Sequence, residues 1–114
     1  MSTLTTHILD TAEGKPAAGV RVTVEIFRQK HEWEQLASGA TNADGRIPGL
    51  IPQDQPLATG TYRLTFHVRD YFTAQGRKSF YPLVQVVCEI EGGSGHYHVP
   101  LLISPWGYTT YRGS

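Results

Sequence analysis

Residues 96–104 read HYHVPLLIS, and they form the most informative strand pattern in this chain of 114 residues. Alternate side chains of a strand point to opposite faces, so a period of two separates a core face from an outer face. The core face predicted here is apolar: Tyr97, Val99, Leu101 and Ile103. The opposite face mixes imidazoles with apolar groups: His96, His98, Pro100 and Leu102. Because apolar residues on an outer face need a cover, we expect a second subunit to pack there.

The same alternation recurs along most of the chain and indicates further strands. The predicted strands are residues 4–9, 20–26, 33–41, 62–69, 84–90 and 107–112, separated by turn signals at 13–16, 44–45, 59–60 and 92–95. Short strands at this spacing predict an all-β sandwich. Residues 70–78 differ, because Asp70 can act as an N-cap, and they predict two turns of helix that end near Gly76.

Composition narrows the classes of function. Ten Lys plus Arg residues balance ten Asp plus Glu residues, which argues against nucleic acid and anionic membranes as partners. The single cysteine, Cys88, is expected to be a buried strand residue and excludes an intramolecular disulfide. The length predicts one domain over residues 1–114. No segment has about 20 consecutive apolar residues and no signal sequence is evident, so we expect a cytoplasmic protein.

Two histidines are expected on the outer surface of one sheet. In the first strand, Thr5, His7 and Leu9 alternate with apolar Leu4 and Ile8, so the imidazole of His7 points outward, as that of His98 does. A pair of imidazoles can orient and deprotonate water near neutral pH. A histidine on a strand is more often an ordinary surface residue, which is the interpretation kept for three others: His31, His67 and His96.

A zinc site is an alternative for the same histidines. His96 and His98 point the same way, and His7 could supply a third nitrogen ligand. However, no carboxylate or cysteine stands at ligand spacing to support this alternative, so we expect no metal.

Arg46 follows an Asp-Gly pair, which usually marks a plain tight turn. A guanidinium could also hold a planar, carbonyl-rich heterocycle and stabilise negative charge that develops on oxygen. The sequence has no glycine-rich phosphate loop, no paired catalytic carboxylates and no nucleophile elbow. Attack by water, assisted by histidine and arginine, therefore remains as the predicted chemistry.

Four segments, in order, resemble the 5-hydroxyisourate hydrolase family. They are LTTHILDT at 4–11 followed by GKPA at 14–17, NADGR at 42–46, FYP at 80–82, and HYHVPLLISP at 96–105 continuing through Gly107 and Tyr108 to the closing YRGS at 111–114. They span almost the whole chain. Transthyretin is similar in fold but lacks the Tyr-Arg-Gly-Ser ending, so this ending favours the enzyme over a hormone carrier.

The resemblance implies a transthyretin-like sandwich of eight strands in two four-stranded sheets, with one short helix. It also implies a homotetramer, built as a dimer of dimers, with active sites in a channel between the dimers. The first and penultimate strands are neighbours in that fold. The family's active-site positions correspond to His7, Arg46, His98 and the tail Tyr111–Ser114.

The implied reaction is hydrolysis of 5-hydroxyisourate at a ring amide, which gives 2-oxo-4-hydroxy-4-carboxy-5-ureidoimidazoline without a cofactor. His7 and His98 would position and deprotonate water, and Arg46 would bind the substrate and stabilise the oxyanion. The tail would complete and line the pocket: Tyr111, Arg112 and Ser114 with its terminal carboxylate. The alternative class is a carrier that holds an aromatic ligand in the same channel, which the three polar residues His7, Arg46 and His98 disfavour.

Overall fold

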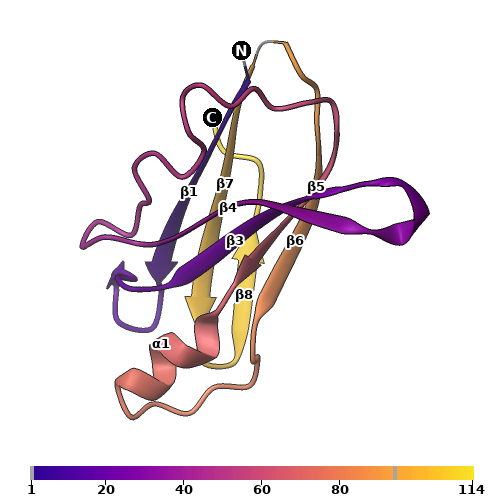
Figure 1. The fold of residues 1–114 in the computed structure, drawn as a ribbon. Coiled ribbons are helices and arrows are strands. Elements are labelled where there is room, and N and C mark those ends of the chain that lie inside the picture. Colours follow the sequence, from indigo (N-terminus) through magenta and orange to yellow (C-terminus); the bar gives the residue numbers. More distant parts are fainter. Residues whose placement is uncertain (1, 94) are drawn as a thin grey trace.

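The alternating segments form two four-stranded sheets in a computed structural model that describes residues 2–93 and 95–114. One sheet has the order β2-β1-β7-β8 and the other β4-β3-β5-β6, with the helix α1 at one end of the sandwich (Figure 1). The predicted sandwich with one short helix is thus confirmed. Ser94, in the turn predicted at 92–95, lies outside the described residues. The elements are β1 Ser2–Asp10, β2 Lys15–Pro16, β3 Arg21–Phe27, the 3-10 turn η1 Gln29–His31, β4 Trp33–Ala40, β5 Gly60–Phe66, α1 Val68–Ala74, β6 Val84–Ile90, β7 Gly95–Ser104 and β8 Gly107–Thr110.

The inner faces of both sheets build one apolar core. Every second side chain of the central strand β3 is buried, and β5 follows the same alternation except that Thr65 is buried as well. The largest fully buried side chains come from both sheets and from α1: Tyr62, Phe66, Phe72, Ile8, Leu64, Ile90, Leu101 and Ile103. At about 25 cal/mol per Å² of buried apolar area, these side chains supply the main stabilisation of the fold.

β1 and β7 run parallel and carry the residues that concern function. Their register sets Thr5 opposite His98 and His7 opposite Pro100. Paired residues of a parallel ladder project to the same face, so both histidines lie on the outer face of this sheet. Pro100 on that face is already buried within the chain, whereas Leu102 is only half-buried. The uncovered apolar area is therefore smaller than the alternation predicts.

The predicted end of the strand at 62–69 is wrong. β5 ends at Phe66, and α1 begins at Val68 with His67, not Asp70, as its N-cap. The reason is that Val68 is spaced three and four residues from Tyr71 and Phe72, and all three are buried on one face of the helix. α1 ends at Ala74, close to the predicted end at Gly76.

Two other segments also differ from the prediction. Lys15 and Pro16, expected in a turn, pair with Asp10 and Leu9 and form the short edge strand β2. The last strand, β8, ends at Thr110 instead of Arg112.

Cys88 is half-buried on β6, and burial raises the pKa of its thiol. Within the described residues, no helix is long and apolar enough to cross a membrane.

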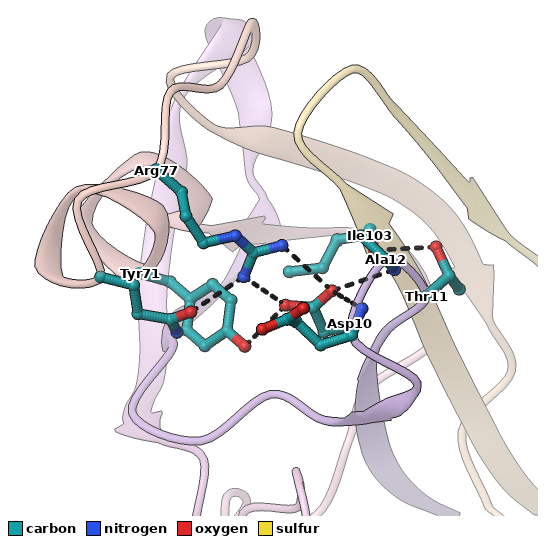
Figure 2. Close-up of polar contacts among 8 residues, drawn as sticks. Asp10, Thr11, Ala12, Tyr71, Arg77 and Ile103 are labelled. Atoms are coloured by element: carbon teal, nitrogen blue, oxygen red, sulfur yellow. Dashed lines mark hydrogen bonds and ion pairs between the residues drawn. The ribbon is translucent and has the colours of Figure 1, made fainter.

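Asp10, the last residue of β1, anchors the helical end of the sandwich. Its side chain is fully buried. It accepts hydrogen bonds from Tyr71 Oη and Arg77 Nη1, each at 2.8 Å (Figure 2). The backbone N–H groups of Ala12 and Glu13 also donate to its Oδ1 at 3.1 Å. Burial raises the pKa of the Asp10 carboxyl, but these hydrogen bonds and the Arg77 charge outweigh it and hold the pKa below its ordinary value. One carboxylate therefore ties β1, the following turn and the segment after α1 together.

Candidate active site

His98, on the outer face of β7, is the centre of the candidate site. Its ring is half-buried, and Nδ1 lies 2.8 Å from Thr5 Oγ1 across the β1–β7 pair. Burial lowers the pKa of His98, and the neighbouring positive charges of Arg46, His96 and His7 lower it further. The ring is therefore neutral near pH 7 and keeps a lone pair that can accept a proton.

A short loop holds Arg46 against β1. Asn42 Oδ1 accepts hydrogen bonds from the backbone N–H groups of Asp44 at 2.9 Å and Arg46 at 3.1 Å. Gly45 has a φ of +76°, and a Cβ at this position would collide with the carbonyl oxygen of Ile8. Gly45 O in turn accepts from Ile8 N at 2.8 Å. Only glycine allows this approach, so the Asp-Gly pair is not a plain hairpin turn here.

His7 lies next to this loop. Its Nε2 is 2.9 Å from the carbonyl oxygen of Asp44, and because a carbonyl only accepts, Nε2 carries the proton. In the neutral ring, the lone pair is then on Nδ1. The backbone of His7 also forms an isolated bridge with Arg46. The loop therefore fixes both the position of Arg46 and the tautomer of His7.

The C-terminal tail runs beside His98. Gly113 N donates to His98 O at 2.7 Å, and the two residues form a bridge. This bridge continues the pairing of β7 with β8. In that pairing Leu101 lies opposite Thr110, and three residues further along each segment His98 lies opposite Gly113. A Cβ at position 113 would lie 2.5 Å from His98 Cδ2. Glycine is thus required here for space next to the imidazole.

An open cavity of about 960 Å³ brings three of the predicted residues together: Arg46, His98 and Ser114. His7 does not line it, although its charge acts on His98. Tyr111 and Arg112 line a different hollow of about 250 Å³, where they lie near β6. The Arg112 guanidinium sits 4.6 Å above the Tyr97 ring. In the single chain, the predicted residues other than His7 are therefore divided between two separate hollows.

Three residues that line the cavity of His98 were not among the predicted catalytic or substrate-binding residues: Thr3, Thr5 and His96, the last considered only as a zinc ligand. Thr5 Oγ1 also lies 3.4 Å from His96 Nε2, and Thr3 Oγ1 lies 2.6 Å from His96 Nδ1. The His96 and His98 rings are stacked, with centroids 6.3 Å apart and planes 11° from parallel. Alternation already placed His96 on the face of His98. Only the register between β1 and β7 places a threonine hydroxyl between them.

The zinc alternative has no set of ligands in the described part of the chain. Among residues 2–93 and 95–114, no group of three or more His, Cys, Asp or Glu side chains is arranged to hold a metal ion. His7 directs Nε2 to a backbone carbonyl, and His98 directs Nδ1 to Thr5. Each of these two rings therefore has one nitrogen already occupied by a protein partner.

Comparison with known proteins identifies the family to which this chain belongs. A model described as the HIUase/Transthyretin family matches residues 4–113. A 5-hydroxyisourate hydrolase of Mus musculus is 47% identical over 114 residues, covering 99% of this chain and 96% of that protein. The structure of Klebsiella pneumoniae 5-hydroxyisourate hydrolase has a TM-score of 0.83 and 43% identity, covering 100% of this chain and 94% of the other. Sea bream transthyretin in complex with thyroxine has a TM-score of 0.90 and 37% identity, covering 96% and 93%. This chain therefore belongs to the HIUase/transthyretin family.

Proposed function

We propose that this chain is a hydrolase that opens 5-hydroxyisourate at a ring amide and yields 2-oxo-4-hydroxy-4-carboxy-5-ureidoimidazoline. The observation that carries the proposal is that Arg46, His98 and Ser114 line one cavity. The relatives named 5-hydroxyisourate hydrolase support it, because they match nearly the full chain at 42% to 47% identity. The cavity sets the polar groups of Arg46, His98 and Ser114 in a largely apolar lining, which fits a small, planar heterocycle rich in carbonyl groups.

His98 is the proposed general base. It takes a proton from water, and the resulting hydroxide adds to the ring carbonyl carbon. Arg46 stabilises the oxyanion that forms. The tetrahedral intermediate then collapses, the ring C–N bond breaks, and the leaving nitrogen recovers the proton from His98. His7, whose tautomer the Asp44 carbonyl sets, helps to position the water and lowers the pKa of His98. Ser114 hydrogen-bonds the substrate.

The direct test is to follow the decay of freshly made 5-hydroxyisourate by ultraviolet absorbance, with and without protein. We expect a protein-dependent decay that persists in the presence of a chelator, because the proposed chemistry uses no metal. A decay equal to that of buffer would refute the proposed function. Activity lost on chelation and restored by zinc would instead favour the three-histidine metal site.

A carrier function is the second candidate, since the chain is also similar to a transthyretin solved with thyroxine. The cavity disfavours it. The lining of the cavity is mostly apolar, as in ligand sites generally. However, Arg46, His96 and His98 within it supply charge and proton acceptors that a carrier of an aromatic ligand does not need. Binding of thyroxine without any hydrolysis of 5-hydroxyisourate would reverse this preference.

The pH dependence of turnover should show an acid limb below pH 6.5, the ordinary pKa of histidine. His98 must be neutral to accept a proton, and its pKa is lowered by burial and by Arg46, His96 and His7. Activity should therefore persist down to that lowered pKa and fall at lower pH. The measurement is kcat/KM across pH 5 to 8 in buffers of constant ionic strength. A rate that is flat over this range would contradict base catalysis by histidine.

The functional assembly is proposed to be a homotetramer, built as a dimer of dimers. Half-buried Leu102 and the open cavity lie on the outer face of the same sheet, so a second pair of chains could cover both. Sedimentation should give a particle four times the 12.6 kDa mass of the chain. A stable monomer with full activity would exclude a channel shared between dimers.

A cytoplasmic location also remains a prediction.

A further inference from the structure

The tautomer of His98 decides whether it can act as a base. Nδ1 faces Thr5 Oγ1 at 2.8 Å, so Nε2 is the ring nitrogen left for water. A neutral imidazole carries one proton, and Nε2 can accept a proton only if that proton sits on Nδ1. His98 Nδ1 must then donate to an acceptor, and the hydroxyl oxygen of Thr5 is an acceptor at hydrogen-bond distance.

The hydroxyl of Thr5 is shared between two imidazoles. Oγ1 lies 2.8 Å from His98 Nδ1 and 3.4 Å from His96 Nε2. A hydroxyl has one proton to donate and two lone pairs to accept with. If Thr5 donates to His96, its oxygen accepts from His98, which is the arrangement a base requires. If Thr5 donates to His98 instead, the proton of His98 sits on Nε2 and the ring cannot take another from water.

The surroundings favour the productive arrangement. Thr3 Oγ1 lies 2.6 Å from His96 Nδ1. A neutral His96 that donates from Nδ1 to Thr3 keeps its Nε2 lone pair for the Thr5 proton. Each donation then runs in the same direction, from His98 to Thr5, from Thr5 to His96 and from His96 to Thr3. Hydrogen bonds ordered in this way polarise and strengthen one another.

We propose that Thr5 is a positioning residue, whose hydroxyl accepts from His98 Nδ1 and donates to His96, and so holds His98 in the tautomer that deprotonates water. This inference rests on the proposed hydrolysis and adds the residue that prepares its base. His96 acts through Thr5 and does not contact the reacting atoms. Protonation of His96 would leave it no lone pair for the Thr5 proton and would release that proton toward His98.

Three variants test the role of the hydroxyl. Thr5→Val keeps the shape of the side chain but removes the hydroxyl, and Thr5→Ser restores it. Thr23→Val, at a half-buried threonine on β3 of the other sheet, is the matched control. We expect Thr5→Val to lower kcat by at least about tenfold with little change in KM, because the proton-transfer step is impaired and not binding. Thr5→Ser and the control should stay close to wild type.

The tautomer itself can be read by ¹⁵N NMR of the histidine rings, independently of activity. In wild type and Thr5→Ser, the proton of neutral His98 should sit on Nδ1, and in Thr5→Val it should move largely to Nε2. His96→Gln should shift the acid limb of kcat/KM upward, since the protonated form of His96, which adds to the positive charges of Arg46 and His7 that face His98, is then absent. Ser114 of the C-terminal tail is a further polar residue that lines this cavity, and none of these variants changes it.

The outcomes separate this inference from the proposed function. Wild-type protein without hydrolytic activity would refute the function, while the NMR measurement would still decide whether Thr5 sets the tautomer. An active wild type together with a Thr5→Val variant of unchanged kcat, or with an unchanged His98 tautomer, would overturn the inference. A Thr5→Val variant that fails to fold is replaced by Thr5→Ala, read against Thr5→Ser in the same two measurements.

Discussion

Removal of residues 111–114 is expected to abolish turnover of 5-hydroxyisourate while the sandwich stays folded. Tyr111, Arg112 and Ser114 are exposed, so they contribute little to the apolar core. The deletion does remove the hydrogen bond from Gly113 N to His98 O and takes Ser114 out of the cavity. Loss of groups that position a reaction costs about 100-fold or more in rate. The measurements are the 5-hydroxyisourate decay rate, thermal melting and particle size of the same preparation.

A point variant makes the same test without shortening the chain. Gly113→Ala would place a Cβ 2.5 Å from His98 Cδ2, so the imidazole or the tail must shift. The matched control is Gly107→Ala on β8, where the nearest atom to a new Cβ is Ser104 Oγ at 3.8 Å. We expect a loss of activity at position 113 only. Near-full activity of both the truncated chain and Gly113→Ala would show that the tail is not part of the site.

Asp10→Asn should destabilise the fold by about 3 kcal/mol, since removing one partner of a buried ion pair leaves the other uncompensated. The Asp10 side chain is 0% exposed, and that of its partner Arg77 is 22% exposed. In either orientation the asparagine amide turns its N–H groups toward donors, because Oδ2 now accepts from Tyr71 and Arg77 and Oδ1 accepts from the backbone N–H groups after Asp10. The total stability of a domain is only about 5–15 kcal/mol, so this is a large fraction. Urea unfolding at fixed protein concentration measures it.

The matched control removes a carboxylate from a surface pair. In the pair of Arg28 with Glu34 the side chains are 50% and 52% exposed, so Glu34→Gln should cost about 0–1 kcal/mol.

The pH dependence of stability supplies a second check on Asp10. Its pKa is lowered on folding, so its stabilising effect is present above the unfolded pKa, about 3.9, and is lost as pH falls through the folded value. The stability gap between wild type and Asp10→Asn should therefore narrow below about pH 4. Equal stability at pH 7 would contradict the anchoring role.

Helix α1 shows where local patterns stop being decisive. The alternation of Tyr62, Leu64, Phe66 and Val68 is compatible with one continuous strand. The spacing of Val68, Tyr71 and Phe72 is equally compatible with the buried face of a helix. Packing at the end of the sandwich selects the helix, and the sequence pattern alone does not separate the two around residue 67.

By itself, the sequence determined which side chains point inward, because the alternation of a strand is a local property of the backbone. It therefore placed Val99 and Leu101 in the core and His7 and His98 on an outer face. The tertiary structure decided which outward groups meet. Register between β1 and β7 depends on chain segments about 90 residues apart, and it set Thr5 between His96 and His98. The approach of Arg46 required the positive φ of Gly45 against β1, and the approach of the tail required space at Gly113. Contacts of this kind depend on long-range packing, which no local period contains.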